Sequence, residues 1–446
     1  MCHAGRTANG HRRPRCFEIK PRDETRAGGE PQLTNRGFLS PYRVLDLTED
    51  GARLAGHMLA QLGAEVIQVE PPASRSGSGT CFVRSAYTAG KRSVTCDIDQ
   101  PDGRALFLRL VDTADILIES AAPDVMARRG LDHEALRAAF PRLIHVSITP
   151  FGSWGPKAGY AATDLTIWAA GGPLLPARRD ERAPLRISVP QSLLHAAGDA
   201  ANGAMVALFA RRRTGRGQHV TVSAQESVAQ ATLSCVLAAA VGHDNFSIRP
   251  QVRNSGRKTL DLSGSGTRTG RTKWELRDGI AELHLAMGPA TGRFTNNLFA
   301  WLREENACDE RIAAWDWVTL PKRIEADEID EDEVERARTL VADFLITKTK
   351  AELIDNAIRR KLLLAPVMTI ADLVDSPQLA ARSYFRTVED ATGTRQLLPG
   401  PFAKLDRPGF APIRPAPEAG ADNAAVYARI GLSAPDIASL ETAGVI

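Results

Sequence analysis

The sequence lacks the features that place a protein in a membrane or on nucleic acid. No apolar run reaches the roughly 18 residues that a membrane helix needs, so we expect no membrane span. The 56 Lys and Arg residues nearly balance the 53 Asp and Glu residues, and the net charge is only +3. Such a balance argues against a nucleic-acid partner.

The cysteines form no framework, and the common catalytic motifs are missing. The six cysteines contain no CxxC pair, and no group of His and Cys has zinc spacing. Scattered thiols are typical of a reducing cytoplasm, so we expect a cytoplasmic protein without a metal. The acidic run at 325–335 is expected to be a solvated helix face or loop. There is also no GxSxG, Walker or HExxH motif.

What is present is an ordinary globular composition, with 43% hydrophobic and 24% charged residues. A chain of 446 residues predicts two domains, or one large domain with an insert. Residues 1–40 hold eight basic and four acidic residues without hydrophobic periodicity. We expect this basic head to be disordered and dispensable, and a targeting or anion-binding arm is the alternative.

Hydrophobic periodicity alternates between the patterns of strands and helices from residue 42 onward. Short apolar runs predict strands, and apolar residues at helical spacing predict helices between them. Repeated βαβ units predict a parallel sheet in a doubly wound α/β domain. The predicted strands are 44–47, 64–70, 116–119, 143–148 and 218–223, and the predicted helices are 52–62, 101–113, 132–139 and 193–213.

The composition changes near residue 250, where a long Gly-, Ser- and Thr-rich loop is expected at 253–273. We predict that residues 41–250 form the first part of a large domain and that 251–340 form a small α+β domain. Residues 341–446 are predicted to be a helical return and the C-terminal part of the large domain. Within this last segment, 335–385 has helical spacing, the Pro-rich stretch 399–417 is expected to be extended, and 432–442 a short helix.

Nine longer segments carry more information through their order than any of them does alone. They are VLDLT at 44–48, LGAEVIQVEPP at 62–72, AGKRSVTCDI at 89–98, ADILIESAAPDVMARRGLD at 114–132, PRLIHVSITPFGSWGP at 141–156, ATDLTIWAAGG at 162–172, ALFARRRTGRGQHVTVSAQES at 207–227, APVMTIADLVDSPQLAARSYF at 365–385 and AAVYARIGLSAPDIASLETAGVI at 424–446. This succession resembles the family III CoA-transferases, a group that includes formyl-CoA and carnitine CoA-transferases and alpha-methylacyl-CoA racemases.

The resemblance implies a fold, substrates and partners. The fold is α/β, with a Rossmann-like large domain, a smaller α+β domain and two subunits interlocked as a dimer. The substrates are an acyl-CoA thioester and a carboxylic acid, and coenzyme A is the implied cofactor. The partner is either a second copy of the chain or a paralogous subunit.

The resemblance also implies which residues contact coenzyme A. A basic side chain after a strand end suits a phosphate, which supports Arg128 on physical grounds. The alternative for Arg128 is a solvated helix arginine, and for Lys91 and Arg92 it is solvation of a turn. The positions that match the family are Asp50, Gly51, Ala52, Lys91, Arg92, Ser120, Ala121, Val125 and Arg128.

The nucleophile of the family is an aspartate at the start of a helix, about twenty residues before TGRGQ. An ungapped alignment places Leu193 there, and leucine cannot attack a thioester. Asp199 lies six residues downstream, roughly 9 Å along a helix, and would need a shift of register. Asp164 matches a second acidic position, with a helix N-cap as the alternative role. Thr163 precedes it where the racemases have histidine.

The sequence leaves four hypotheses open. The chain is a CoA-transferase that uses Asp164 or Asp199, or a CoA-transferase subunit whose sister chain supplies the aspartate. The third hypothesis is a racemase acting by proton exchange at the alpha carbon. The fourth is a non-catalytic CoA-binding partner of an active paralogue. The lone His195 is expected to pack rather than to catalyse.

Overall fold

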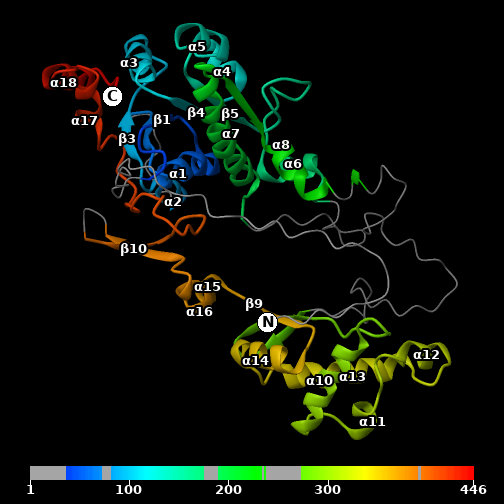
Figure 1. Cartoon of the computed structure of the whole chain (residues 1–446). Helices are drawn as coiled ribbons and strands as arrows, with labels where there is room; N and C mark the ends of the chain where they lie inside the picture. The colour runs from blue at the N-terminus through cyan, green and yellow to red at the C-terminus, as the bar shows by residue number, and fades with distance from the viewer. Residues whose placement is uncertain (1–36, 73–81, 175–188, 234–235, 238–272, 390–392) are drawn as a thin grey trace, which may run out of the picture. The chain divides into compact units, whose positions relative to one another are not determined.

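A computed structural model describes residues 37–72, 82–174, 189–233, 236–237, 273–389 and 393–446 (Figure 1). Most of the basic head and nearly all of the predicted 253–273 loop lie outside the described residues.

The first part of the fold is a six-stranded parallel sheet with the order β3-β2-β1-β4-β5-β6. Its formation confirms the predicted doubly wound α/β fold. The chain adds β2 and β3 on one side of β1, and then β4, β5 and β6 on the other side, so the order of the strands reverses between β1 and β4. Ligands of such sheets bind outside the carboxyl ends of the strands at this reversal point. The strands are β1 (Arg43–Asp46), β2 (Glu65–Glu70), β3 (Arg92–Thr95), β4 (Ile116–Glu119), β5 (Ile144–Thr149) and β6 (His219–Ser223).

Helices cover both faces of this sheet because successive strand residues point to opposite faces. Val44 packs into the core on one face and Leu45 into the core on the other. The first face carries η1 (Asp50–Arg53), α1 (Leu54–Gln61), α6 (Asp164–Gly171), α7 (Ser192–Thr214) and α8 (Ala224–Ala229). The second carries α3 (Pro101–Asp112), α4 (Pro123–Arg128), α5 (His133–Ala139), α17 (Asn423–Arg429) and α18 (Ala434–Thr442).

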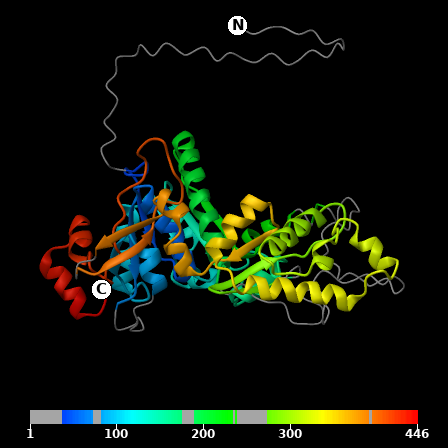
Figure 2. The ribbon, with the colours of Figure 1, turned by 90° about the horizontal axis from the view of Figure 1, so that it is seen from below.

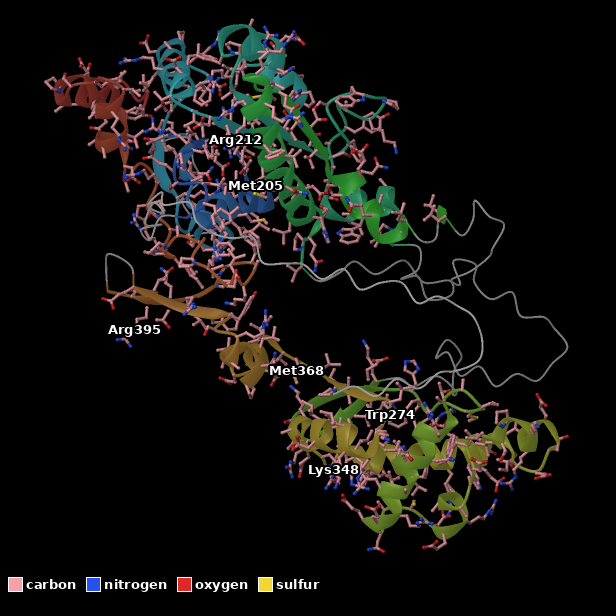
Figure 3. The ribbon with its side chains drawn as sticks, viewed as in Figure 1. Met205, Arg212, Trp274, Lys348, Met368 and Arg395 are labelled. Carbon is pink, nitrogen blue, oxygen red and sulfur yellow. The ribbon has the colours of Figure 1, made fainter. Side chains whose placement is uncertain are left out.

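Helix α7 is the longest helix of this part, and Figure 3 labels Met205 and Arg212 on it. Six of its nine buried residues are alanines, which lets it approach α1, β5 and β6 closely. By length and composition it is the one described helix that passes as a candidate membrane span. Its packing on the sheet is that of a core helix, and its buried Arg211 pairs with Asp115.

Five short helices around this sheet were not predicted from the sequence, because one or two turns are too few to show a period. They are α4, α6, α8 and α17, which pack on the faces of the sheet, and α2 (Phe82–Thr88), which packs against η1 and α1. A short 3-10 helix, η2 (Gln230–Thr232), follows α8. The predicted helix 52–62 also differs, since its first turn is the 3-10 helix η1.

A second core surrounds a three-stranded antiparallel sheet, and Figure 3 labels Trp274 and Lys348 in it. Because β9 pairs with β8 and α13 runs through residue 340, this core extends past the boundary predicted there. The strands are β7 (Lys273–Leu276), β8 (Gly279–Leu283) and β9 (Leu364–Val367). The helices are α10 (Gly292–Glu304), α11 (Glu310–Ala313), α12 (Leu320–Glu325), α13 (Glu331–Leu345) and α14 (Lys350–Arg360).

The segment predicted to be helical up to residue 385 also contains strands. After β9 come α15 (Ile370–Val374), α16 (Pro377–Ala381) and an antiparallel hairpin of β10 (Phe385–Glu389) and β11 (Arg395–Pro399). The Pro-rich connection that follows has no helix or strand, as predicted. The chain then returns to the six-stranded sheet, where α17 contacts β3 (red in Figure 1 and Figure 2).

Candidate active site

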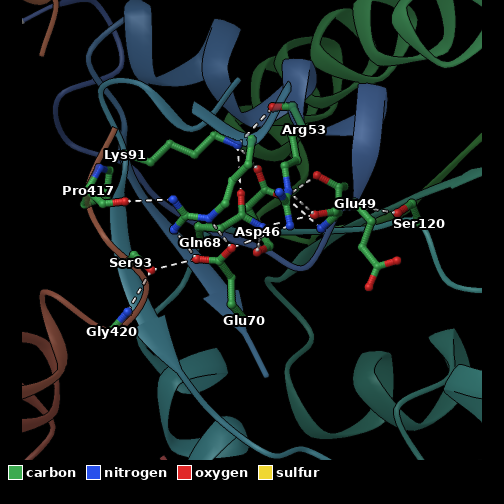
Figure 4. A network of polar contacts seen from close by, with 12 residues as sticks. Asp46, Glu49, Arg53, Gln68, Glu70, Lys91, Ser93, Ser120, Pro417 and Gly420 are labelled. Atoms are coloured by element: carbon green, nitrogen blue, oxygen red, sulfur yellow. Dashed lines mark hydrogen bonds and ion pairs between the residues drawn. The ribbon is translucent and has the colours of Figure 1, made fainter. Parts of the chain in front are cut away.

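The loop after β1 is held by a buried polar network (Figure 4). Lys91 Nζ lies 2.7 Å from Asp46 Oδ2, and both side chains are fully buried. The same ammonium donates to Gln68 Oε1 and to the Arg53 carbonyl, each at 2.9 Å. Asp46 Oδ1 accepts from the Thr48 backbone and hydroxyl. Every member is satisfied, so the network fixes the loop instead of leaving a buried charge unpaired.

Because of this network, Lys91 is not available to bind a phosphate group. All three of its donors are taken, and the burial of its ammonium lowers its pKa. The neighbouring Arg92 is 40% exposed but pairs with Glu65 and Asp422. Neither residue lines the cavities described below: Lys91 helps to hold the loop after β1, whereas Arg92 pairs with residues outside that loop.

Gly56 on α1 is required by the same network. A Cβ at this position would lie 1.9 Å from Asp46 Oδ2 and 3.1 Å from Lys91 Nζ. No real Cβ atom is accommodated at such a distance, so any larger residue must displace the ion pair.

An inner cavity of about 350 Å³ opens at the carboxyl ends of β1 to β4, the position expected for a ligand of this fold. Its polar lining is dominated by carboxylates, with one arginine. Ser120 closes one side, because its hydroxyl accepts a 3.0 Å hydrogen bond from the Glu49 backbone. The lining includes the predicted Ser120, Ala121 and Val125, together with Glu49, Glu70, Asp97, Asp99, Glu119 and Arg129.

Burial and hydrogen bonding set the chemistry of two groups in this lining. Burial alone would raise the pKa of Glu70, but its hydrogen bond with Arg84, the Arg84 charge and the Ser93 hydroxyl together lower it. Burial raises the pKa of the Cys96 thiol to about 12. Cys96 is therefore a protonated thiol at neutral pH and is excluded as the thiolate nucleophile.

An outer cavity of about 390 Å³ adjoins the inner one and is lined by three arginines. Arg128 belongs to this lining, as predicted, but its side chain is 68% exposed and pairs with Asp124 on the same helix. Arg129 lies between the two cavities and holds Asp99 at 2.7 Å. Arg104 on α3 is the third arginine. This is the part of the site whose charge suits a phosphate.

The loop that borders the inner cavity also contacts the start of α7. A Cβ at Gly51 would lie 3.3 Å from Leu193 Cβ, so Gly51 and Leu193 are packed together. Asp50, which precedes it, is exposed and has a backbone φ of +45°, while Ala52 is buried. The predicted loop Asp50–Ala52 therefore lies in contact with Leu193, the predicted nucleophile position.

Asp164 approaches the same helix start from α6. Its Oδ1 accepts hydrogen bonds from the backbone nitrogens of Gln191 and Ser192, each at 2.8 Å. These are free N–H groups of the first turn of α7, so Asp164 stabilises a helix other than its own. Thr163, the residue before it, is the N-cap of α6. The predicted alternative role of Asp164 is that of a helix N-cap. Its Oδ1 does cap a helix, but that helix is α7 and not α6, to which Asp164 belongs.

Three polar atoms near this helix start are buried without a hydrogen-bond partner. Among the described residues seven such side-chain atoms occur, and Asp164 Oδ2, Trp168 Nε1 and Ser192 Oγ are three of them. Buried polar groups are usually paired, so a concentration of unpaired ones marks a place where a polar ligand group can bind. Both a hydrogen-bond acceptor and N–H or O–H donors are available there.

The other candidates lie further along α7. Asp199 accepts a 3.3 Å hydrogen bond from Gln230. His195 is exposed and packs edge-on against Trp168, with ring centroids 5.7 Å apart. No hydrogen bond links either of them to Asp164 among the described residues. The structure brings Asp164 to the expected nucleophile position, and it does not bring Asp199 there.

Sequence reasoning missed several residues of the site. Neither Arg129 nor Arg104 was singled out. A usable signal existed for Arg129, because it follows β4, which ends at the reversal point of the sheet, whereas Arg104 follows the edge strand β3. The acidic lining of Glu49 and Glu119 gave no such signal, since carboxylates at strand ends have many structural roles.

Comparisons with known proteins agree with one another. The sequence profile "CoA-transferase family III" matches residues 39–423. The chain is 29% identical over 422 residues to "Succinyl-CoA:(R)-benzylsuccinate CoA-transferase subunit BbsE" of Thauera aromatica, which covers 91% of this chain and 98% of the relative. It is 35% identical over 201 residues to "Succinate--glutarate CoA-transferase" of Agrobacterium fabrum, which covers 42% of this chain and 50% of the relative. A CAIB/BAIF family protein from Brucella suis has the same fold, with a TM-score of 0.69, 24% identity and coverage of 89% and 100%.

Proposed function

Because the chain belongs to CoA-transferase family III, we propose that it binds an acyl-CoA thioester and takes part in moving coenzyme A to a carboxylic acid. It is a transferase of the CoA group. We further propose that it works as a subunit whose partner chain supplies the aspartate nucleophile. The observation that carries this proposal is Leu193 at the start of α7.

The charges of the two cavities orient coenzyme A. Its phosphates belong in the outer cavity with Arg104, Arg128 and Arg129, since the inner lining is acidic and would repel them. The thiol-bearing arm then runs through the inner cavity along the loop after β1. That loop packs against Leu193, so the thioester is directed to the start of α7.

The family reaction requires a carboxylate at this point. Its oxygen attacks the thioester carbonyl, the CoA thiolate leaves and a mixed anhydride forms. The thiolate then attacks the carbonyl of the enzyme's own carboxyl, which releases the first acid and leaves an enzyme–CoA thioester. The second acid takes over the CoA by the reverse steps. Leu193 has no atom that can perform the first attack.

A second chain resolves this difficulty. The Thauera aromatica relative, which aligns over nearly all of its length, is itself named as a subunit. We propose that the present chain likewise pairs with a paralogue, in the cytoplasm, as an interlocked heterodimer. The present chain then binds CoA in its own pocket, stabilises the partner chain, or does both. The covalent chemistry takes place on the partner's aspartate.

Asp164 supports a second candidate function, in which the chain acts alone. Its Oδ2 is buried and unpartnered beside Leu193, so one carboxylate oxygen is free to attack. Against this, Oδ1 is held by two backbone N–H groups of α7, which stabilise the carboxylate and reduce its tendency to form an anhydride. Asp199 is less favoured because it lies beyond the cluster of unpartnered atoms.

The racemase hypothesis receives no support from these relatives, which are named as CoA-transferases. Thr163 precedes Asp164, so the His–Asp pair of the racemases is absent at this position.

An activity assay tests the proposal. The purified chain is incubated with succinyl-CoA and a carboxylic acid such as glutarate or benzylsuccinate, alone and with a co-expressed paralogue that carries aspartate at the position of Leu193. We expect transfer only in the mixture. Full transfer by the chain alone would instead establish Asp164 or Asp199 as the nucleophile.

A further inference from the structure

Three histidines from different elements meet at the β6 edge of the large sheet. His145 and His219 are paired across β5 and β6, and His133 begins α5. Their rings are stacked, with centroids 4.2 Å apart for His133 and His219 and 4.8 Å apart for His145 and His219. One nitrogen of each ring lies within 4.8 Å of the others. The CoA-transferase chemistry described above uses none of the three.

The buried member of the group has the surroundings of a metal ligand. His145 is 3% exposed, and its Nδ1 is buried without a hydrogen-bond partner. Its other nitrogen, Nε2, lies 3.5 Å from the Ser147 hydroxyl and 3.6 Å from Glu119 Oε1. Histidines that bind metals commonly donate their second N–H to a carboxylate, which fixes the ring and leaves the opposite nitrogen free for the ion. Glu119 is itself oriented by the backbone of Ala121.

We propose that His133, His145 and His219 form a binding site for one divalent transition-metal ion of the Zn²⁺ type. Three imidazole nitrogens with water as a fourth ligand are a common donor set for zinc. Nitrogen ligands select such ions over Mg²⁺ and Ca²⁺, which prefer oxygen.

Binding requires the rings to turn as well as to approach one another, because stacked rings do not point their in-plane nitrogen lone pairs at a common ion. In a tetrahedral site with Zn–N bonds of about 2.05 Å, ligand nitrogens are roughly 3.3 Å apart. The nitrogens must therefore close from at most 4.8 Å, and rotation of the two less buried side chains, His133 and His219, can supply this movement. The hydroxyl of Ser147, 2.8 Å from His219 Nε2, is placed to orient that ring.

Metal titration of the full-length chain tests this site. The protein is freed of metal with a chelator and titrated with ZnCl₂ by calorimetry, and with CoCl₂ by visible absorption. We expect one ion per chain and a cobalt spectrum of a four-coordinate nitrogen and oxygen site. His133→Ala and His219→Gln should each weaken binding by at least about tenfold, and Glu119→Gln by about 10–100-fold.

His284→Gln is the matched control, because His284 is an exposed histidine beside an acid, Glu282, outside the cluster. It should bind zinc as the wild type does. His133 is partly exposed, so His133→Ala is expected to keep its metal-free melting temperature, and Glu119→Gln provides a test if that variant fails to fold. The proposal is overturned by the absence of saturable binding, by binding that survives both histidine substitutions, by equal loss in His284→Gln, or by a thiolate charge-transfer band.

Discussion

Asp164 Oδ1 lies 2.8 Å from the backbone nitrogen of Ser192, the first residue of α7. The carboxylate of Asp164, on α6, thus caps the N-terminus of α7 one residue before Leu193. The start of α7 is the point where a family III CoA-transferase would carry its nucleophile. In this chain the nearby acid is engaged with the backbone, and the expected position is apolar.

Loss of this cap should weaken the fold. Asp164→Ala removes the acceptor for two N–H groups of α7, and cap substitutions of this kind cost about 0.5–2 kcal/mol. Asp164→Asn keeps an acceptor oxygen and should cost less. Urea denaturation of both variants measures the difference. Equal stability of Asp164→Ala and the wild type would show that the contact contributes nothing.

The buried ion pair beneath the loop should be far more sensitive. Lys91→Met leaves Asp46 charged and buried without its partner, and such a loss costs about 3–5 kcal/mol. Arg92→Met is the control, because Arg92 is 40% exposed and its pairs are worth about 1 kcal/mol or less. Denaturant unfolding should separate the two variants. Similar small losses for both would contradict the positioning role of Lys91.

The outer cavity should determine CoA affinity. Arg128→Ala and Arg129→Ala each remove a guanidinium placed for a phosphate, and each should weaken CoA binding by about 1–3 kcal/mol. Arg137→Ala serves as the control, since Arg137 is an exposed arginine of α5 that does not line either cavity. Calorimetry with CoA, with and without the paralogous chain, makes the comparison. An equal effect of all three substitutions would place the phosphates elsewhere.

Glu70 should make the stability of the folded chain depend on pH in the acidic range. Its pKa is lower in the folded chain than its ordinary value of 4.5, so the unfolded chain binds the proton more readily. The stabilisation is complete above about pH 4.5 and is lost as the pH falls through the lower folded pKa. Glu70→Gln should flatten the fall of the melting temperature with pH below about pH 4.5. An unchanged slope in the variant would assign the acid sensitivity to other groups.

The sheet was predictable from the sequence, whereas much of the site was not. Most of the predicted strands, such as 116–119, contain a short run of apolar residues between helices, and the local pattern identifies them. The pairing of Lys91 with Asp46 joins residues 45 positions apart, so no local pattern reveals it. For the same reason Lys91 was predicted to bind CoA although it is buried.

The position of Asp164 beside α7 illustrates the same limit. Its neighbour in space is Ser192, 28 positions away, and the contact depends on how α6 and α7 pack. The placement of Leu193 at the expected nucleophile position, in contrast, is a prediction that the order of the family segments makes from the sequence. The residue type at a single position can be judged from the sequence, whereas contacts between distant elements cannot.

Intact-mass spectrometry after incubation with an acyl-CoA tests the central claim most directly. Wild-type chain and Leu193→Asp are each treated with succinyl-CoA, quenched with acid and mapped by peptide, alone and together with the paralogous chain. The account predicts no adduct on the wild-type chain, a CoA thioester on the partner's aspartate in the mixture, and an adduct on Leu193→Asp if that variant folds. A CoA thioester on Asp164 or Asp199 of the wild-type chain would contradict it.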